Sequence, residues 1–171
     1  MSRSSHLVLA LTGIAIAGLA SSAEAQNTAV ASINATANVS GVAPLTAAGV
    51  NDLNFGNVTA GTPKSPTSPS ADGGRFNISG QPNNPVSVTF TLPTVLTGGG
   101  GSTIPITFNN TDGLNWTNFP IASSPFNPNV PFFTTLSPTG TLVIGILGTV
   151  SPPLATTTGT YTGTVTLTVA Y

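Results

Sequence analysis

The chain has 171 residues, a formal net charge of −1 and 4% charged residues, with no cysteine and a single histidine. So few basic residues cannot form a patch that follows a phosphate backbone, which excludes nucleic acid as a partner. The lack of thiols excludes disulfides and thiolate metal sites, while the length suits one domain with a sizeable hydrophobic core.

The first 25 residues have the pattern of a secretory signal peptide. Arg3 and His6 precede an apolar run at 7–20, and an A-x-A site ends at Ala25. The run is shorter than the ~18–20 residues that a helix needs to cross a bilayer. The sequence therefore predicts cleavage after Ala25 and export to the periplasm or cell surface. The mature domain is expected over 26–171, without an integral membrane segment.

Strand-like alternation opens the mature chain at 29–39. Small or apolar residues occupy every second position, and Asn, Ser and Thr occupy most of the others. This segment is interpreted either as the first strand of the domain or as a donor strand that pairs with another sheet, and both alternatives stay open. The inward positions are Ala31, Ile33, Ala35, Ala37 and Val39.

A short motif, "DLNFGNVTAGT", follows at 52–62. Leu53 and Phe55 stand two residues apart, and Gly56 indicates a bend or bulge. Residues 61–74 are rich in Pro, Ser and Gly and are expected to form a surface loop.

Further strands are predicted where apolar residues alternate again, at 76–78, 86–92, 104–108 and 142–146. Pro105 is expected to restrict the third of these to an edge or a strand end, because proline cannot donate to a ladder. The fourth is apolar enough to predict a strand buried on both faces. Residues 109–138 show no steady period.

The most regular alternation is the closing stretch, "GTYTGTVTLTVAY", at 159–171. Threonine occupies nearly every outward position, which predicts a strand with one wet and one dry face. The residues considered for the dry, partner-docking side are Gly159, Tyr161, Val165, Leu167, Val169 and Tyr171.

These elements together predict an all-β fold of about seven short antiparallel strands joined by Gly- and Pro-containing turns. No window has the pattern of an amphipathic helix, and the helix formers Glu, Lys and Arg are nearly absent. A β-sandwich is the expected architecture, with a closed barrel as the alternative.

Catalysis is not expected. The only histidine, His6, belongs to the signal peptide, so neither a Ser-His-Asp triad nor a Cys-His pair can form, and zinc lacks ligands. The mature carboxylates Asp52, Asp72 and Asp112 stand in turn-like contexts, where Asp commonly bonds the backbone. We therefore expect no enzyme, no metal and no cofactor.

Aromatic residues at 109–138 allow a different kind of site. Trp116, Phe119 and Phe126 could stack against the apolar face of a sugar, or they could close one end of the core. We favour the core interpretation because large aromatic side chains dominate core burial.

Three stretches carry a family resemblance: "DLNFGNVTAGT" (52–62), "VSVTFTLP" (86–93) and "GTYTGTVTLTVAY" (159–171). In this order they resemble an uncharacterised family of secreted bacterial domains, close to spore-coat-protein-U domains and to subunits of chaperone–usher pili. The resemblance covers most of the mature chain, and 109–138 matches least.

The resemblance implies an immunoglobulin-like, pilin-like sandwich that lacks or exchanges one strand. In pilus subunits the last strand carries a Gly twelve positions before a Tyr near the terminus, as Gly159 and Tyr171 do here. The partners it implies are a periplasmic chaperone, an usher and copies of the same or related subunits. Such partners act by β-augmentation, in which a strand is added to a sheet edge.

The resulting expectation is an exported structural protein, a pilin-like or coat-like subunit in adhesion or surface structure. The alternative is a secreted, non-catalytic carbohydrate-binding module that folds as a self-complete sandwich. The sequence leaves open whether the partner of the last strand belongs to the same chain or to another.

Overall fold

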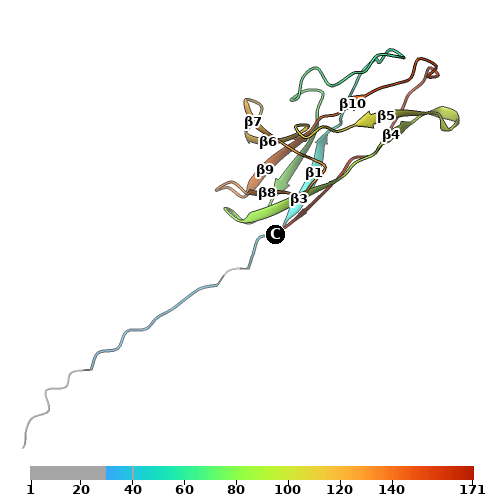
Figure 1. The fold of residues 1–171 in the computed structure, drawn as a ribbon. Helices are drawn as coiled ribbons and strands as arrows, with labels where there is room; N and C mark the ends of the chain where they lie inside the picture. The colour runs from blue at the N-terminus through green and yellow to red at the C-terminus, as the bar shows by residue number, and fades with distance from the viewer. Residues whose placement is uncertain (1–29, 40) are drawn as a thin grey trace, which may run out of the picture. The chain divides into compact units, whose positions relative to one another are not determined.

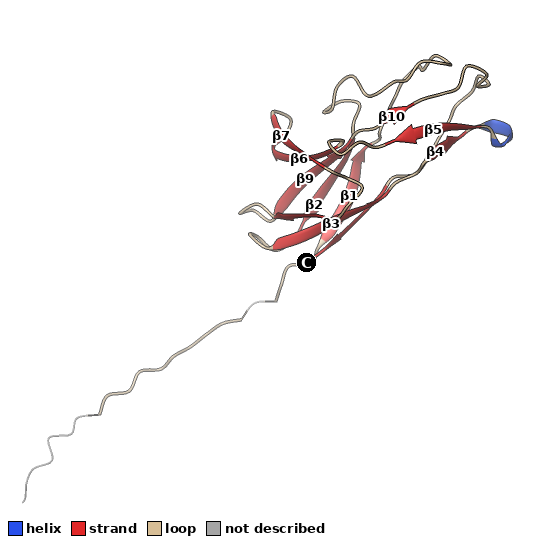
Figure 2. Ribbon diagram, in the orientation of Figure 1, coloured by secondary structure: helices blue, strands red, loops and turns tan. Residues whose placement is uncertain are grey.

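The computed structural model of the chain describes residues 30–39 and 41–171. They fall into two units, a segment that ends at Val39 and a compact domain from Ser40 to Tyr171. The predicted signal peptide, 1–25, lies outside the described residues, as does Ala29. The regular structure in the described part of the domain is all strand except for one short 3₁₀ helix, η1, at Gly99–Gly101 (Figure 2), which confirms the predicted all-β class.

Eleven strands are present among the described residues, instead of about seven. In chain order they are β1 (Thr46–Asn51), β2 (Gly74–Ser79), β3 (Pro85–Thr91), β4 (Val95–Thr97), β5 (Thr103–Thr107), β6 (Gly113–Asn118), β7 (Ala122–Phe126), β8 (Phe132–Thr135), β9 (Thr141–Ile146), β10 (Thr149–Val150) and β11 (Thr166–Ala170).

The strands form three antiparallel sheets. The largest has the order β1-β2-β9-β6-β7, the second has the order β11-β3-β8, and the third has the order β10-β5-β4. The first two face each other as a sandwich, because the main core cluster takes its side chains from both. Its buried members are Ile78, Val86, Val88, Phe126, Leu136, Leu142 and Ile144.

A second core cluster fills the end of the domain where β4, β5 and β10 lie (Figure 1). It is built from Leu96, Ile104, Ile106 and Val150, which are all buried. The last strand, β11, ends at the opposite end of the domain (Figure 1). The domain interior is therefore two clusters along one axis, and both contribute to the candidate site.

The prediction for Pro105 is wrong, because β5 is the middle strand of its sheet. Pairing with β4 uses the neighbouring residues, for example Ile106 N, which donates to Thr94 O at 3.1 Å. On the other side Pro105 needs only to accept, and Ser151 N donates to its carbonyl at 3.0 Å. A missing N–H costs nothing where no acceptor faces it.

The strand at 142–146 is confirmed as a doubly covered strand. It corresponds to β9, the centre of the five-stranded sheet, where Ile144 is fully buried on the inner face. On the outer face Gly145 is also buried, because a Cβ there would lie 3.0 Å from Trp116 Nε1. The indole of Trp116 thus covers a strand that sequence alone placed in the interior.

Three strands, β6, β7 and β8, lie in the segment that showed no period. β6 buries Leu114 and Trp116 on its outer face and has Asn115 on the other, an alternation that covers only a few residues. β7 contains Pro125 and exposes most of its residues. Alternation is a weak signal when a strand is short or mostly exposed.

Candidate strand-docking groove

The two sheets of the sandwich meet at two pairs of edge strands, and these pairs differ. β7 and β8 close one side through an aromatic stack, with ring centroids of Phe126 and Phe132 4.0 Å apart and Phe90 at 6.4 Å from Phe126. Asn115 Nδ2 also donates to Thr134 Oγ1 at 3.3 Å, joining the sheets. Such closure protects sheet edges from pairing with another chain.

The other side is the seam between β1 and β11, and a groove of about 1020 Å³ opens at one end of this seam, lined by Gly49 and Asn51 of β1 and by the chain that precedes β11. Each of these strands has one neighbour within its sheet among the described residues, β2 for β1 and β3 for β11. The groove lies toward the second core cluster, between residues 49–60 and 156–165. The buried side chains at its floor include Leu96, Ile104, Ile106, Ile146 and Val150.

The first wall is the "DLNFGNV" motif. Leu53 and Phe55 point to the same side and pack, half-buried, against the second core cluster. Gly56 has φ of +59°, the left-handed conformation that glycine adopts most readily, so the predicted bend is confirmed. Asn54 fixes the wall, since its N–H donates to Asp72 O at 2.8 Å and its Oδ1 accepts from Gly56 N at 2.8 Å.

The second wall is the chain that leads into β11. Thr162 exchanges two backbone hydrogen bonds with Thr97 of β4, at 2.8 and 2.9 Å, while 163–165 belong to no strand. The predicted strand at 159–171 is therefore shorter in the structure, a bridge at Thr162 and then β11. Gly163 packs closely here, because a Cβ would lie 2.6 Å from Leu96 Cδ2 and the Leu96 side chain would have to shift.

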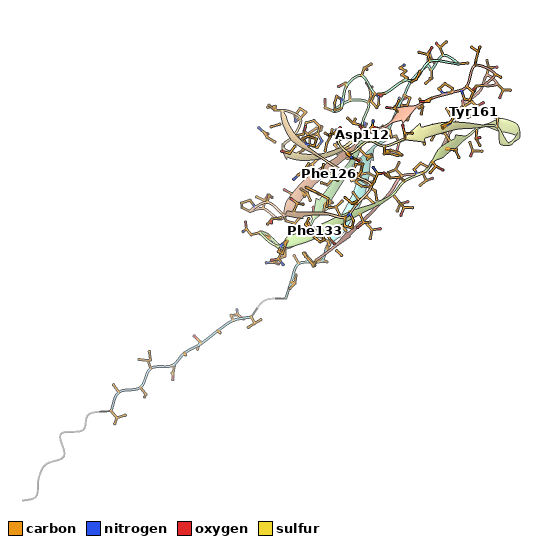
Figure 3. All side chains as sticks on the ribbon, viewed as in Figure 1. Asp112, Phe126, Phe133 and Tyr161 are labelled. Carbon is orange, nitrogen blue, oxygen red and sulfur yellow. The ribbon has the colours of Figure 1, made fainter. Side chains whose placement is uncertain are left out.

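Tyr161 closes the outer end of this wall (Figure 3). Its ring lies where a side chain at Gly98 would be, and its hydroxyl donates to Thr157 O at 2.8 Å. Hydrogen bonds from Ser102 and Thr157 lower the pKa of the Tyr161 phenol below its ordinary value. Gly159, with φ of +154°, lies in the same stretch.

Apolar side chains that are only partly buried line both walls of the groove. Leu53, Phe55 and Val58 on one wall and Tyr161 and Val165 on the other are half-buried. The same holds along β11 for Leu167 and Val169, which pack against the main core cluster. A row of half-buried apolar residues, beside two strands that each have one sheet neighbour among the described residues, is the pattern expected where a strand could be added.

The structure divides the predicted docking residues between two places. Gly159, Tyr161 and Val165 lie at the groove, and Leu167 and Val169 continue the same face along β11. Tyr171 lies at the other end of the seam. There its hydroxyl donates to Ala43 O at 2.8 Å and accepts from Gln81 N at 2.6 Å.

The segment 30–39 belongs to no strand in the structure, and all its side chains are exposed. Ile33 and Val39 are 95% and 90% exposed. The alternative in which this segment is the domain's first strand is therefore wrong, because β1, at Thr46–Asn51, has that place. Sequence reasoning missed β1 because "TAAGVN" is mostly exposed and lacks an apolar alternation.

The aromatic residues considered for sugar stacking are largely enclosed. Trp116 and Phe126 are each 8% exposed, and Phe119 packs edge-on against Trp116 at 5.0 Å. The guanidinium of Arg75 covers the ring of Phe119 at 4.3 Å. Phe126 belongs to the main core cluster, in agreement with the core interpretation, whereas Trp116 is buried on the outer face of the five-stranded sheet and belongs to neither cluster.

The carboxylates examined for catalysis serve turns where the structure gives them partners. Asp72 Oδ2 accepts from Thr67 Oγ1 at 2.8 Å and from Ser68 N at 3.1 Å, and Asp112 Oδ2 accepts from Asn109 N at 2.6 Å. Within the described residues, no three His, Cys, Asp or Glu side chains cluster as a metal site.

Comparison with known proteins adds no relative. No protein-family model matches the chain, and no curated protein matches it either. Among residues 30–39 and 41–171, the structure contains no helix of the length and hydrophobicity that a membrane span requires.

Proposed function

We propose that this protein is an exported structural subunit that assembles by β-strand complementation, pilin-like or coat-like in its role. The observation that carries the proposal is the seam between β1 and β11, with its open groove and half-covered apolar walls. Added strands gain affinity from the backbone ladder and specificity from alternate side chains in pockets.

The proposed occupant is the segment Ala31 to Val39 of a second copy. It is exposed, carries no charge, and alternates small or apolar with mostly polar residues, as a strand that fills a groove must. Ile33 is its largest inward side chain. Burying a whole isoleucine side chain contributes about 1.5–3 kcal/mol, or roughly 10- to 150-fold in affinity.

Composition supports assembly as well. Two copies with a net charge near zero repel each other weakly. The resemblance to chaperone–usher subunits supports the same arrangement, with a chaperone strand before assembly and a neighbouring subunit's segment afterwards.

The proposal is tested with the mature chain, residues 26–171, and a variant that lacks 30–39 but keeps every strand of the domain. Light scattering after gel filtration should show concentration-dependent polymers for the first and monomers for the second. A fluorescent peptide of residues 30–42 should bind the deletion variant, which fluorescence anisotropy measures.

A matched pair of peptides sharpens this test. Ile33→Asp places a charge at an inward position and should abolish binding, whereas Asn34→Asp places the same charge at the adjacent outward position and should change affinity less than threefold. A mature chain that stays monomeric at all concentrations, with a domain that binds no peptide, would contradict the proposal.

A further inference from the structure

Tyr171 joins the two sides of the seam at the end away from the groove. Its hydroxyl donates to Ala43 O at 2.8 Å and accepts from Gln81 N at 2.6 Å. Ala43 N in turn donates to Gln81 Oε1 at 2.9 Å. We call these three hydrogen bonds the Tyr171 latch. Gly80 makes room for it, since a Cβ there would lie 2.5 Å from the Tyr171 hydroxyl.

The latch connects β11 to the chain that enters β1. β11 runs from Thr166 beside the groove to Ala170, immediately before Tyr171, whereas β1 begins at Thr46 near Ala43 and runs toward the groove. The two strands thus run in opposite directions and approach each other along the seam. The Tyr171 latch holds one end of the seam together, and the groove opens at the other end. The two ends are about 20 Å apart, the length of a six-residue strand.

The uncovered face of β11 continues past the groove into the fastened half. Leu167 and Val169 are half-buried there, so a strand that filled the groove would gain further apolar contact by extending along them. Hydrogen bonds that hold β11 against Ala43 and Gln81 oppose this extension, because they keep the two edges together.

We propose that the Tyr171 latch is an autoinhibitory contact: it holds half of the seam closed in the free subunit, and a full-length docked strand must release it. This inference rests on the proposed function and names a control on the same site. Docking therefore begins at the open groove near Tyr161 and proceeds toward Tyr171. The occupant is the segment 31–39 of a second copy.

Tyr171→Phe tests the latch, because it removes the hydroxyl and keeps the ring. Tyr161→Phe is the matched control, since it removes the other tyrosine hydroxyl, the one bonded to Thr157 at the groove end. Hydrogen exchange measured by NMR should accelerate at the Gln81 amide by roughly 2- to 12-fold, the equivalent of one net hydrogen bond, in Tyr171→Phe and not in the control.

Both substitutions are then placed in the variant that lacks 30–39, and binding of the 30–42 peptide is measured by anisotropy. Tyr171→Phe should raise the affinity by roughly 2- to 12-fold, because opening no longer breaks the hydroxyl's bonds, and Tyr161→Phe should not raise it. Equal affinity of Tyr171→Phe and the parent protein would overturn the latch while leaving strand docking intact.

The two arms separate the two proposals. If no variant binds the peptide, the proposed function fails. The inhibitory role of the latch is then wrong as well. This holds even if faster exchange at the Gln81 amide shows that the Tyr171 hydroxyl bonds across the seam. If the peptide binds and Gln81 exchange is unchanged in Tyr171→Phe, the latch alone is wrong.

Discussion

The closed side of the sandwich offers a sharp test of the fold, through two phenylalanines in neighbouring strands. Phe126 of β7 is 8% exposed and stacks on Phe132, with 4.0 Å between ring centroids. Its ring also fills the space of a side chain at Gly113, where a Cβ would lie 2.6 Å away. Phe133 of β8, the matched control, is 75% exposed (Figure 3).

Replacing Phe126 by Ala removes a buried ring and leaves a cavity that Gly113 cannot fill. Phe→Ala substitutions in cores cost about 3–5 kcal/mol, a large share of the ~5–15 kcal/mol that stabilises a typical domain. For a domain of this size the melting temperature should fall by roughly 10–20 °C. Phe133→Ala should change the free energy of unfolding by less than about 0.5 kcal/mol.

The measurement is urea unfolding followed by circular dichroism, with thermal melts in parallel, on residues 26–171 carrying each substitution. A loss in Phe133→Ala equal to that in Phe126→Ala would refute the reasoning. It would mean that β8 pairs with β3 in a register shifted by one residue, since such a shift exchanges the two faces of a strand.

Two further predictions concern the groove wall. Gly163→Ala should lower the free energy of unfolding by about 1–3 kcal/mol in urea melts, because the new Cβ would press on the buried side chain of Leu96. The control is Gly99→Ala, where nothing lies within 4 Å of the new Cβ. An equal loss of stability in Gly99→Ala would contradict this explanation. The Tyr161 phenol should ionise below the ordinary tyrosine pKa of about 10, because hydrogen bonds from Ser102 and Thr157 lower its pKa. The pKa is measured by absorbance titration at alkaline pH in a Tyr171→Phe variant, in which Tyr161 is the remaining tyrosine. Because the pKa of Tyr161 is lower in the folded protein than in the unfolded chain, ionisation of the phenol stabilises the folded state. This contribution is complete above the unfolded pKa and is lost as the pH falls through the folded pKa. It should be small for an exposed hydroxyl, and a Tyr161 pKa above 10 would contradict the assignment.

Local patterns in the sequence were sufficient to predict the strands whose two faces differ. β2, β3, β5 and β9 lie within or near the predicted segments, and β11 lies inside the predicted final strand, because alternation records which side chains face a core. Gly56 was predicted as a bend from its residue type alone, and its positive φ agrees. The pilin-like assembly itself stays a proposal.

What the sequence determined by itself was therefore the all-β class, the inward face of the last strand and the scarcity of charged residues. Only the tertiary structure decided that Leu53 and Phe55 lie across a groove from Tyr161 and Val165, and that Tyr171 bonds Ala43. Those pairs are far apart in the chain. Their proximity depends on how two sheets pack, and alternation within a strand specifies a face but not its partner.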